Sequence, residues 1–333
     1  MPERRSKAPR TGKPTTSSMW THLTTCVVLP VVLILAPGPA TASIPEAFSG
    51  AVLPDTIEVT SADYRIFRSD GAAATLNDIY EAMRRADVVL VGERHNDPVS
   101  HAVERWIWEE ALQGAGRRRA TLSLEMFSRD TQYIVDEYVS GLITESHFLA
   151  SANPWQNYRQ DYRPLVEAAR HVGADVIAAN APRRYANMVS RGGPTATRAL
   201  SDNARRHLAP WPWAAPSPTY RAEWNVVMEG AHMADTDLEN MLQAQTLWDA
   251  TMAWSIAEYL MRYPGALLVH AVGAFHMESG TGIPEHLARY RPSARQLSVT
   301  VLAEEEFTVF DASRHAGLAD FVILGNASLP RTY

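Results

Sequence analysis

The stretch VVLVGERH, residues 88–95, decides the fold class of this chain. Its apolar, β-branched start predicts a buried strand, and its glycine lets the backbone turn sharply where that strand ends. The stretch LLVHAVGAFH, residues 267–276, repeats the pattern, so each strand is followed by a Gly-x-x-His segment. Ligands of open α/β sheets lie beyond the carboxyl ends of the strands. The two stretches therefore predict His95 and His276 at one edge of one sheet.

A third strand-like run, ATLSL at residues 120–124, ends in Glu125. Together with Glu93 it brings two carboxylates to the edge where His95 and His276 are expected. Imidazole nitrogens and carboxylate oxygens are ligands of Zn, Mn and Fe, and the same groups carry out acid–base catalysis without a metal. The four residues predict a metal or cofactor site, or a site for hydrolysis.

The same residues have structural alternatives. Each histidine could cap its strand end through a ring hydrogen bond to the backbone. Glu125 is costly to bury alone and could pair with Arg94 or Arg183. His101 lies near the start of a predicted helix. It could be a ligand, a partner of His95 or a solvated residue of that helix. The residues alone leave these alternatives open.

Strands alternate with amphipathic helices along the chain, which is typical of a largely parallel sheet covered on both faces. The expected helices span residues 75–85, 98–113, 129–140 and 163–172, and the expected strands span 88–91, 120–124, 175–179, 267–272, 296–302, 307–310 and 321–324. Residues 191–261 contain loop signals and two helical stretches without a strand-like run. The predicted fold class is α/β, a mostly parallel sheet flanked by helices, with a smaller helical subdomain inserted.

We predict three parts in the domain organisation. They are a secretory signal peptide at residues 1–42, an α/β core at 43–190 and 262–333, and the helical subdomain at 191–261. The first part has a basic start, an apolar run and a small-x-small cleavage site, as signal peptides do. A retained membrane anchor is the alternative to cleavage.

Composition limits the chemistry of the mature chain. Cleavage removes five basic residues and one acidic residue, so the formal net charge falls from −6 to −10. This charge argues against nucleic acid as a partner, because nucleic acid needs basic patches. The only cysteine, Cys26, and both lysines, Lys7 and Lys13, lie in the predicted signal. Disulfides, thiolate ligands and Schiff-base lysines are therefore excluded from the mature chain.

Further side chains suit a flat, apolar cofactor. The helical insertion is rich in Trp and Met, which is more often plain core, although a helical lid would suit such a ligand. Tyr158 and Tyr162 are candidate iron ligands, because tyrosinate ligates haem iron. Arg183 follows the strand at 175–179 and suits an anion such as a haem propionate. A salt bridge to a neighbour is equally compatible with Arg183.

In combination, the motifs resemble the ChaN-like haem-binding uptake family within the TIKI/TraB/erythromycin esterase-like superfamily. The matching segments are VVLVGERH (88–95), LEMF (124–127), VIAANAPR (176–183), QTLWDATMA (245–253), GAFH (273–276) and GTGIP (280–284). The resemblance implies an α/β core with a smaller helical subdomain and haem binding in bacterial iron acquisition. It also implies kinship to metal-dependent hydrolases that use paired Gly-x-x-His motifs and a glutamate. Members are often lipoproteins, whereas this chain lacks a usable lipobox.

Two hypotheses follow. In the first, an exported bacterial protein, periplasmic or attached to the envelope, holds haem between the sheet edge and the helical insertion. The haem lies within one chain or is shared across a homodimer, and it passes to a haem-uptake receptor or transporter. The candidate haem-binding residues are His95, His101, Tyr158, Tyr162, Arg183 and His276.

In the second hypothesis the protein is a metal-dependent esterase or peptidase. Its candidate metal-binding and catalytic residues are Glu93, His95, Glu125 and His276, with Mn or Zn as the metal, or with the same side chains activating water directly. A third alternative is an inherited site that is now structural.

Overall fold

A mostly parallel sheet forms the centre of the fold in the computed structural model, which describes residues 57–114, 118–230 and 234–333. The strand order is β2-β1-β8-β7-β3-β6-β4-β5. Six strands pair in parallel: β3 (Val88–Glu93), β4 (Ala120–Ser128), β5 (Asp175–Asn180), β6 (Leu267–Gly273), β7 (Gln296–Glu304) and β8 (Phe321–Asn326). Two short antiparallel strands, β1 (Tyr64–Arg68) and β2 (Ala73–Ala74), extend one side. The predicted fold class is confirmed.

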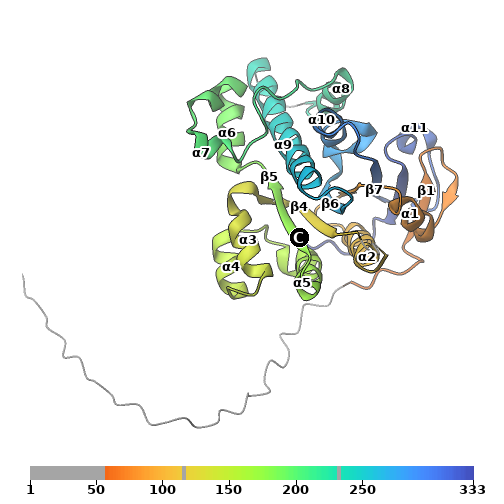
Figure 1. Ribbon diagram of the computed structural model, residues 1–333. Coiled ribbons are helices and arrows are strands. Elements are labelled where there is room, and N and C mark those ends of the chain that lie inside the picture. The colour runs from red at the N-terminus through yellow and green to blue at the C-terminus, as the bar shows by residue number, and fades with distance from the viewer. Residues whose placement is uncertain (1–56, 115–117, 231–233) are drawn as a thin grey trace, which may run out of the picture. The chain divides into compact units, whose positions relative to one another are not determined.

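Helices cover both faces of the sheet (Figure 1). One face packs against α1 (Leu76–Met83), α2 (Pro98–Gly114), α3 (Gln132–Val139) and α5 (Arg163–Val172), and the other against α9 (Asp235–Arg262) and α10 (Ile283–Tyr290). The strands alternate accordingly. Val89 and Val91 belong to the first hydrophobic cluster, and Val88 and Leu90 belong to the second. Strands buried on both faces read as continuous apolar runs, which is why β3 and β6 stand out in the sequence.

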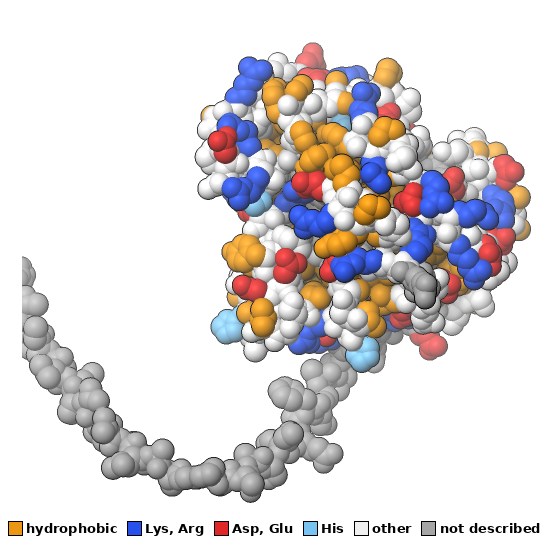
Figure 2. All heavy atoms as spheres, in the orientation of Figure 1, with side chains coloured by type: hydrophobic (Ala, Val, Ile, Leu, Met, Phe, Trp, Pro, Cys, Tyr) orange, Lys and Arg blue, Asp and Glu red, His pale blue; other side chains and the backbone are white. Residues whose placement is uncertain are grey.

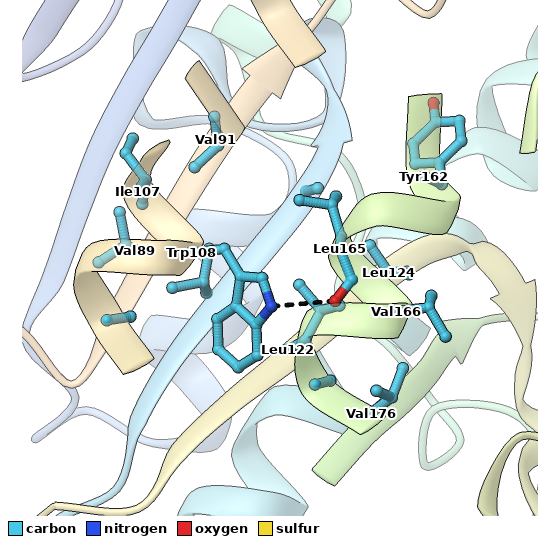
Figure 3. Close-up of a cluster of buried hydrophobic side chains, with 14 of the residues drawn as sticks. Val89, Val91, Ile107, Trp108, Leu122, Leu124, Tyr162, Leu165, Val166 and Val176 are labelled. Atoms are coloured by element: carbon cyan, nitrogen blue, oxygen red, sulfur yellow. Dashed lines mark hydrogen bonds between the residues drawn. The ribbon is translucent and has the colours of Figure 1, made fainter. Parts of the chain in front are cut away.

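The first cluster contains a tryptophan that joins two helices (Figure 3). Trp108 of α2 is fully buried, and its indole N–H donates to the Leu165 carbonyl of α5 at 3.0 Å. Figure 3 shows Val89, Val91 and Leu122 of the sheet beside this contact. The contact fixes α2, which carries His101 and Glu104, against α5, which begins directly after Tyr162.

One expected strand is wrong. Residues 305–308 form a turn, so the expected strand at 307–310 is absent. Phe307 and Phe310 instead pack on Leu302, Val322 and Leu324 in a small hydrophobic cluster. Their apolar character therefore reflects packing of a turn and not strand pairing.

The chain also contains elements that the sequence patterns did not predict. These are β1, β2, α4 (Glu145–Ala152), α6 (Arg183–Gly192), α10 and α11 (Ala312–His315). The insertion contains α7 (Asp202–Arg205), α8 (Pro218–Val227) and α9, and no strand occurs among its described residues. Ile256 and Leu260 of α9 pack on the sheet. The boundaries of a separate helical subdomain stay a prediction.

The predicted signal peptide lies outside the described residues. Within them, no helix has the length and apolar character needed to cross a bilayer. Figure 2 shows arginine and acidic side chains interspersed across the face that it draws.

Candidate functional site

The first half of the site forms where β3 ends. Glu93 is the last residue of β3 and is 2% exposed. Its Oε1 lies 2.7 Å from His95 Nδ1 and also accepts a hydrogen bond from the Tyr162 hydroxyl. The His95 side chain is 41% exposed and packs edge-on against Trp155 at 4.6 Å between ring centroids. His95 Nε2 makes no hydrogen bond to any described residue. The carboxylate therefore orients a half-exposed imidazole whose second nitrogen has no protein partner.

The second half forms where β6 ends and α9 crosses it. His276 follows β6 in a short 3-10 helix and is 6% exposed. Its Nδ1 hydrogen-bonds Asp249 of α9, and Asp249 in turn accepts from the Tyr220 hydroxyl of α8. On its other side, His276 Nε2 lies 3.5 Å from Glu125 Oε1. Both imidazole nitrogens of His276 thus face carboxylates.

Gly273 joins the two halves. Its backbone N–H donates to Glu125 Oε2 at 2.7 Å. A methyl group added to Gly273 would lie 3.0 Å from His95 Cε1, 3.2 Å from His95 Nε2 and 3.5 Å from Glu125 Oε2. The glycine therefore leaves room for His95 beside Glu125. The structure brings together Glu93, His95, Glu125 and His276, the four residues that the strand ends predicted.

A buried polar cluster lies behind Glu93. His101 Nδ1 of α2 lies 3.2 Å from Glu93 Oε2 and 3.0 Å from Glu104 Oε2. His101 Nε2 lies 3.2 Å from the His95 carbonyl oxygen and 3.4 Å from Asp161 Oδ2. His101 is thus neither solvated nor a surface residue of the helix, and it contacts the backbone of His95.

Burial and charge act against each other at Glu93 and its neighbours. Burial alone would raise the pKa of Glu93, but the charge of His101 and the hydrogen bond from His95 lower it to about 2. Burial alone would lower the pKa of His101, but Glu93 and Glu104 raise it to about 10. Burial and the Glu93 charge both raise the pKa of Glu104. We infer an ionised Glu93, a charged His101 and a protonated Glu104.

The same balance holds around His276. Burial alone would lower its pKa, but the charges of Glu125 and Asp249 raise it to about 10. Burial alone would raise the pKa of Glu125, but the charge of His276 lowers it. Burial alone would lower the pKa of His95, but the hydrogen bond to Glu93 and the charge of Glu93 raise it. His276 is therefore a buried imidazolium between two carboxylates.

The charge of His276 should make stability depend on pH. Its folded pKa of about 10 lies above the ordinary value of 6.5, so its contribution is complete below pH 6.5 and is lost as the pH rises toward 10. His276→Gln should therefore reduce the fall in unfolding free energy between pH 7 and 10 by about 1 kcal/mol per pH unit. Urea midpoints at pH 7, 8 and 9 measure this slope, with exposed His147→Gln as control. Equal slopes in all three proteins would contradict the assignment.

The two candidate tyrosines occupy interior positions. Tyr158 is 1% exposed, packs against Phe127 and Phe148, and its hydroxyl has no hydrogen-bond partner. Tyr162 is 2% exposed and donates to Glu93. Burial raises the pKa of both hydroxyls, and the Glu93 charge raises that of Tyr162 further. These positions do not favour tyrosinate ligation of iron.

Arg183 is the first residue of α6, directly beyond β5, and it is exposed. It has no hydrogen-bond or ion-pair partner in the described part of the chain. The alternative of a salt bridge between Glu125 and Arg183 is wrong, since Glu125 contacts His276 and the Gly273 backbone instead. A role of Arg183 toward a propionate stays a prediction.

The sequence patterns missed four side chains of the site. Asp249 and Gln245 come from α9, Tyr220 from α8 and Glu104 from α2. Gln245 Nε2 lies 3.3 Å from His276 Nε2. Gln245 and Asp249 are inside the segment QTLWDATMA, which supports the family resemblance, so that segment was the available signal. Nothing in the sequence distinguished Tyr220 or Glu104 from ordinary helical residues.

Comparisons with known proteins agree with the fold. The sequence model of the family described as "Haem-binding uptake, Tiki superfamily, ChaN" matches residues 79–287. No curated protein matches the sequence. A solved structure of ChaN from Campylobacter jejuni, described as showing cofacial haem binding, is 15% identical; the match covers 80% of this chain and 98% of that chain, with a TM-score of 0.60. At this identity the likeness establishes the fold.

Two further structures resemble the chain more distantly. The type III effector HopBA1 is 11% identical over 75% of this chain and 93% of its own, with a TM-score of 0.43. A mutant of the erythromycin esterase EreC in its open conformation is 10% identical over 72% of this chain and 77% of its own, with a TM-score of 0.41.

Proposed function

We propose, from the premise that this chain belongs to the ChaN haem-binding uptake family of the Tiki superfamily, that it binds haem and that His95 Nε2 ligates the iron. The haem would then be carried as part of iron uptake by an exported bacterial protein. The iron would supply the bond to the imidazole, and the chain would supply the orientation and basicity of that imidazole.

The geometry of His95 is the observation that carries the proposal. Histidines that bind metals usually donate the other ring N–H to a carboxylate or carbonyl, which fixes the tautomer and makes the free nitrogen a better ligand. His95 Nδ1 lies 2.7 Å from Glu93 Oε1, and burial of Glu93 protects that contact from solvent. His95 Nε2 has no hydrogen-bond partner among the described residues, and the side chain is 41% exposed. The residues present therefore fit an imidazole that would ligate haem iron.

The surroundings of His95 suit a porphyrin. Trp155 packs against the ring of His95, and Phe275 is partly exposed beyond Gly273. Arg94, next to His95, has a 45% exposed side chain, and its only ion-pair contact in the described structure is with Glu278 at 3.9 Å. We propose that Arg94 pairs with a haem propionate, in addition to the predicted role of Arg183.

An absorbance titration with hemin tests the proposed function. We expect a saturable Soret shift at a fixed stoichiometry, with band positions of imidazole ligation. Sedimentation of the loaded protein separates a haem held in one chain from a haem shared across a homodimer. A flat titration of folded protein would overturn the proposal.

Arg94→Ala provides a second, smaller test. Loss of one exposed charge-assisted contact should weaken hemin binding about 3–10-fold without changing the Soret position. The exposed Arg105→Ala on α2 is the matched control, since its side chain is similarly exposed. Equal affinity of both variants would remove Arg94 from the site.

Hydrolysis is the second candidate function. Its supporting observation is the convergence of two acid–base pairs, Glu93 with His95 and Asp249 with His276, on Glu125 and Gly273. An imidazole with one nitrogen on a carboxylate and the other free also serves as a general base. The test is ester and peptide hydrolysis by the wild type, with or without added Mn²⁺ or Zn²⁺. Turnover that disappears in Glu125→Gln would support this function, and absence of turnover would exclude it for those substrates.

Export rests on the sequence features of residues 1–42. We propose that the mature protein acts in the periplasm or at the envelope and delivers haem to an uptake receptor or transporter. Fractionation of cells that express the full chain, with mass determination of the N-terminus, tests cleavage and location together.

A further inference from the structure

Glu93, His101 and Glu104 form a compact donor cluster inside the protein. His101 and Glu104 are three residues apart on α2, so both side chains project from one side of the helix toward Glu93 at the end of β3. Each residue offers a ligand atom, and these atoms lie within 4.8 Å of one another. The three residues are 1–7% exposed. Together they offer one imidazole nitrogen and two carboxylates to the same small volume.

The hydrogen bonds of His101 select its tautomer. Nε2 faces two oxygen acceptors, the His95 carbonyl at 3.2 Å and Asp161 Oδ2 at 3.4 Å. Without metal, His101 is charged and carries a proton on both nitrogens; a bound metal ion would displace the Nδ1 proton, and the Nε2 proton would stay with the His95 carbonyl. Nδ1 then faces Glu93 Oε2 and Glu104 Oε2. An imidazole held by a carbonyl on one nitrogen and facing carboxylates with the other has the arrangement of a metal-binding histidine.

Two oxygens of the cluster lack hydrogen bonds although they are buried. Glu93 Oε2 and Glu104 Oε1 have no hydrogen-bond partner among the described residues. Buried carboxylate oxygens are normally satisfied, because an unpaired one costs free energy. In the described structure, the ion-pair contacts of Glu93 and Glu104 are with histidines alone. In the metal-free protein Glu93 and Glu104 share the proton of Glu104, and a cation among these atoms would replace that proton and contact both oxygens.

We propose that Glu93, His101 and Glu104 bind a divalent transition-metal ion of the Zn²⁺ or Mn²⁺ class. An imidazole with two carboxylates suits these ions, whereas Mg²⁺ and Ca²⁺ prefer oxygen ligands alone. The site shares only Glu93 with the metal set predicted from the sequence. A cavity of about 50 Å³ beside α2 is lined by His101 and Asp161, and it is large enough for a water molecule.

The position of Glu93 connects this ion to the haem site. Its Oε1 faces His95 Nδ1, and its Oε2 faces the proposed ion. One carboxylate would therefore contact both the proposed iron ligand and the ion. The metal site does not require bound haem, since none of its three ligands is the proposed iron ligand, although Glu93 contacts both.

Zinc titration of the full chain after EDTA treatment and dialysis tests the inference. We expect the wild type to bind one Zn²⁺ per chain, Mn²⁺ more weakly, as the usual affinity order predicts, and Mg²⁺ not at all. Glu104→Gln should weaken Zn²⁺ binding by more than about 100-fold, because even partners outside the ligand set change metal affinity about 10–100-fold. Exposed Glu109→Gln on the same helix is the matched control.

Folding of the Glu104 variant is checked by its thermal transition. Burial and the charge of Glu93 raise the pKa of Glu104, so this side chain is uncharged in the metal-free protein. Glutamine has nearly the same shape and is also uncharged, so the variant should keep the fold. Glu104→Asp, which keeps the carboxyl group but withdraws both oxygens, is the second variant and should also weaken Zn²⁺ binding.

The outcomes separate this inference from the proposed function. A wild type that binds no Zn²⁺, or a Glu125→Gln variant that loses Zn²⁺ while Glu104→Gln retains it, would overturn the inference. Hemin titration of the same preparation is read separately. Zn²⁺ binding without hemin binding would overturn the haem proposal and leave the metal site standing.

Discussion

Hemin affinity is expected to fall by about 100-fold or more in His95→Ala, with loss of the imidazole-type Soret position. Substitution of a residue that only hydrogen-bonds a metal ligand changes metal affinity about 10–100-fold, so loss of the ligand itself should weaken binding at least as much. His95 Nε2 has no hydrogen-bond partner in the described structure, whereas both nitrogens of His276 face carboxylates. His95 is therefore the imidazole of the site that can bind iron without first breaking a buried ion pair. Absorbance titration of variant and wild type measures the change.

The controls separate ligation from adventitious hemin binding. His147→Ala removes an exposed histidine of α4 and should leave the titration unchanged. Glu93→Gln keeps the imidazole but weakens its contact on Nδ1, so it should give an intermediate affinity. If His95→Ala binds hemin like the wild type and His276→Gln does not, the iron ligand would be His276 and the assignment would be wrong.

The strand ends could be predicted because their signal is local. An apolar run followed by a glycine marks where a buried strand stops, and parallel strands end at the same edge. That reasoning placed Glu93, His95, Glu125 and His276 near one another without any knowledge of side-chain geometry. The family resemblance also rests on short segments of sequence, and the family match over residues 79–287 confirms the resemblance.

The helical contributions could not be predicted in the same way. Asp249 lies on a helix of 28 residues that is buried on much of its surface, so periodicity does not show which polar residue faces the site. His101 looked like a residue near a helix start, and only the packing of α2 against β3 places it behind Glu93. The expected strand at 307–310 was wrong because apolar residues of a turn can also pack in a hydrophobic cluster, as Phe307 and Phe310 do.

Gly282→Ala is expected to lower the free energy of unfolding by about 3–5 kcal/mol. Gly282 has φ 60° and ψ −117°, a conformation that residues with a Cβ avoid at a cost of about 1–3 kcal/mol. The added Cβ would also lie 2.5 Å from the His276 carbonyl oxygen and 3.3 Å from Asp249 Cγ. Backbone strain and a clash with backbone atoms therefore add to one another. The midpoint of thermal unfolding should fall by about 5–10 °C.

Gly280→Ala is the matched control for that prediction. Gly280 also has a positive φ, 69°, but a Cβ placed there meets no atom within 4 Å. Its substitution should cost only the conformational strain, about 1 kcal/mol. Because the clash at Gly282 involves the carbonyl of His276, Gly282→Ala should also disturb the contact between His276 and Asp249. Equal destabilisation of the two variants would contradict the close approach at Gly282, and with it the reason that the segment GTGIP needs its second glycine.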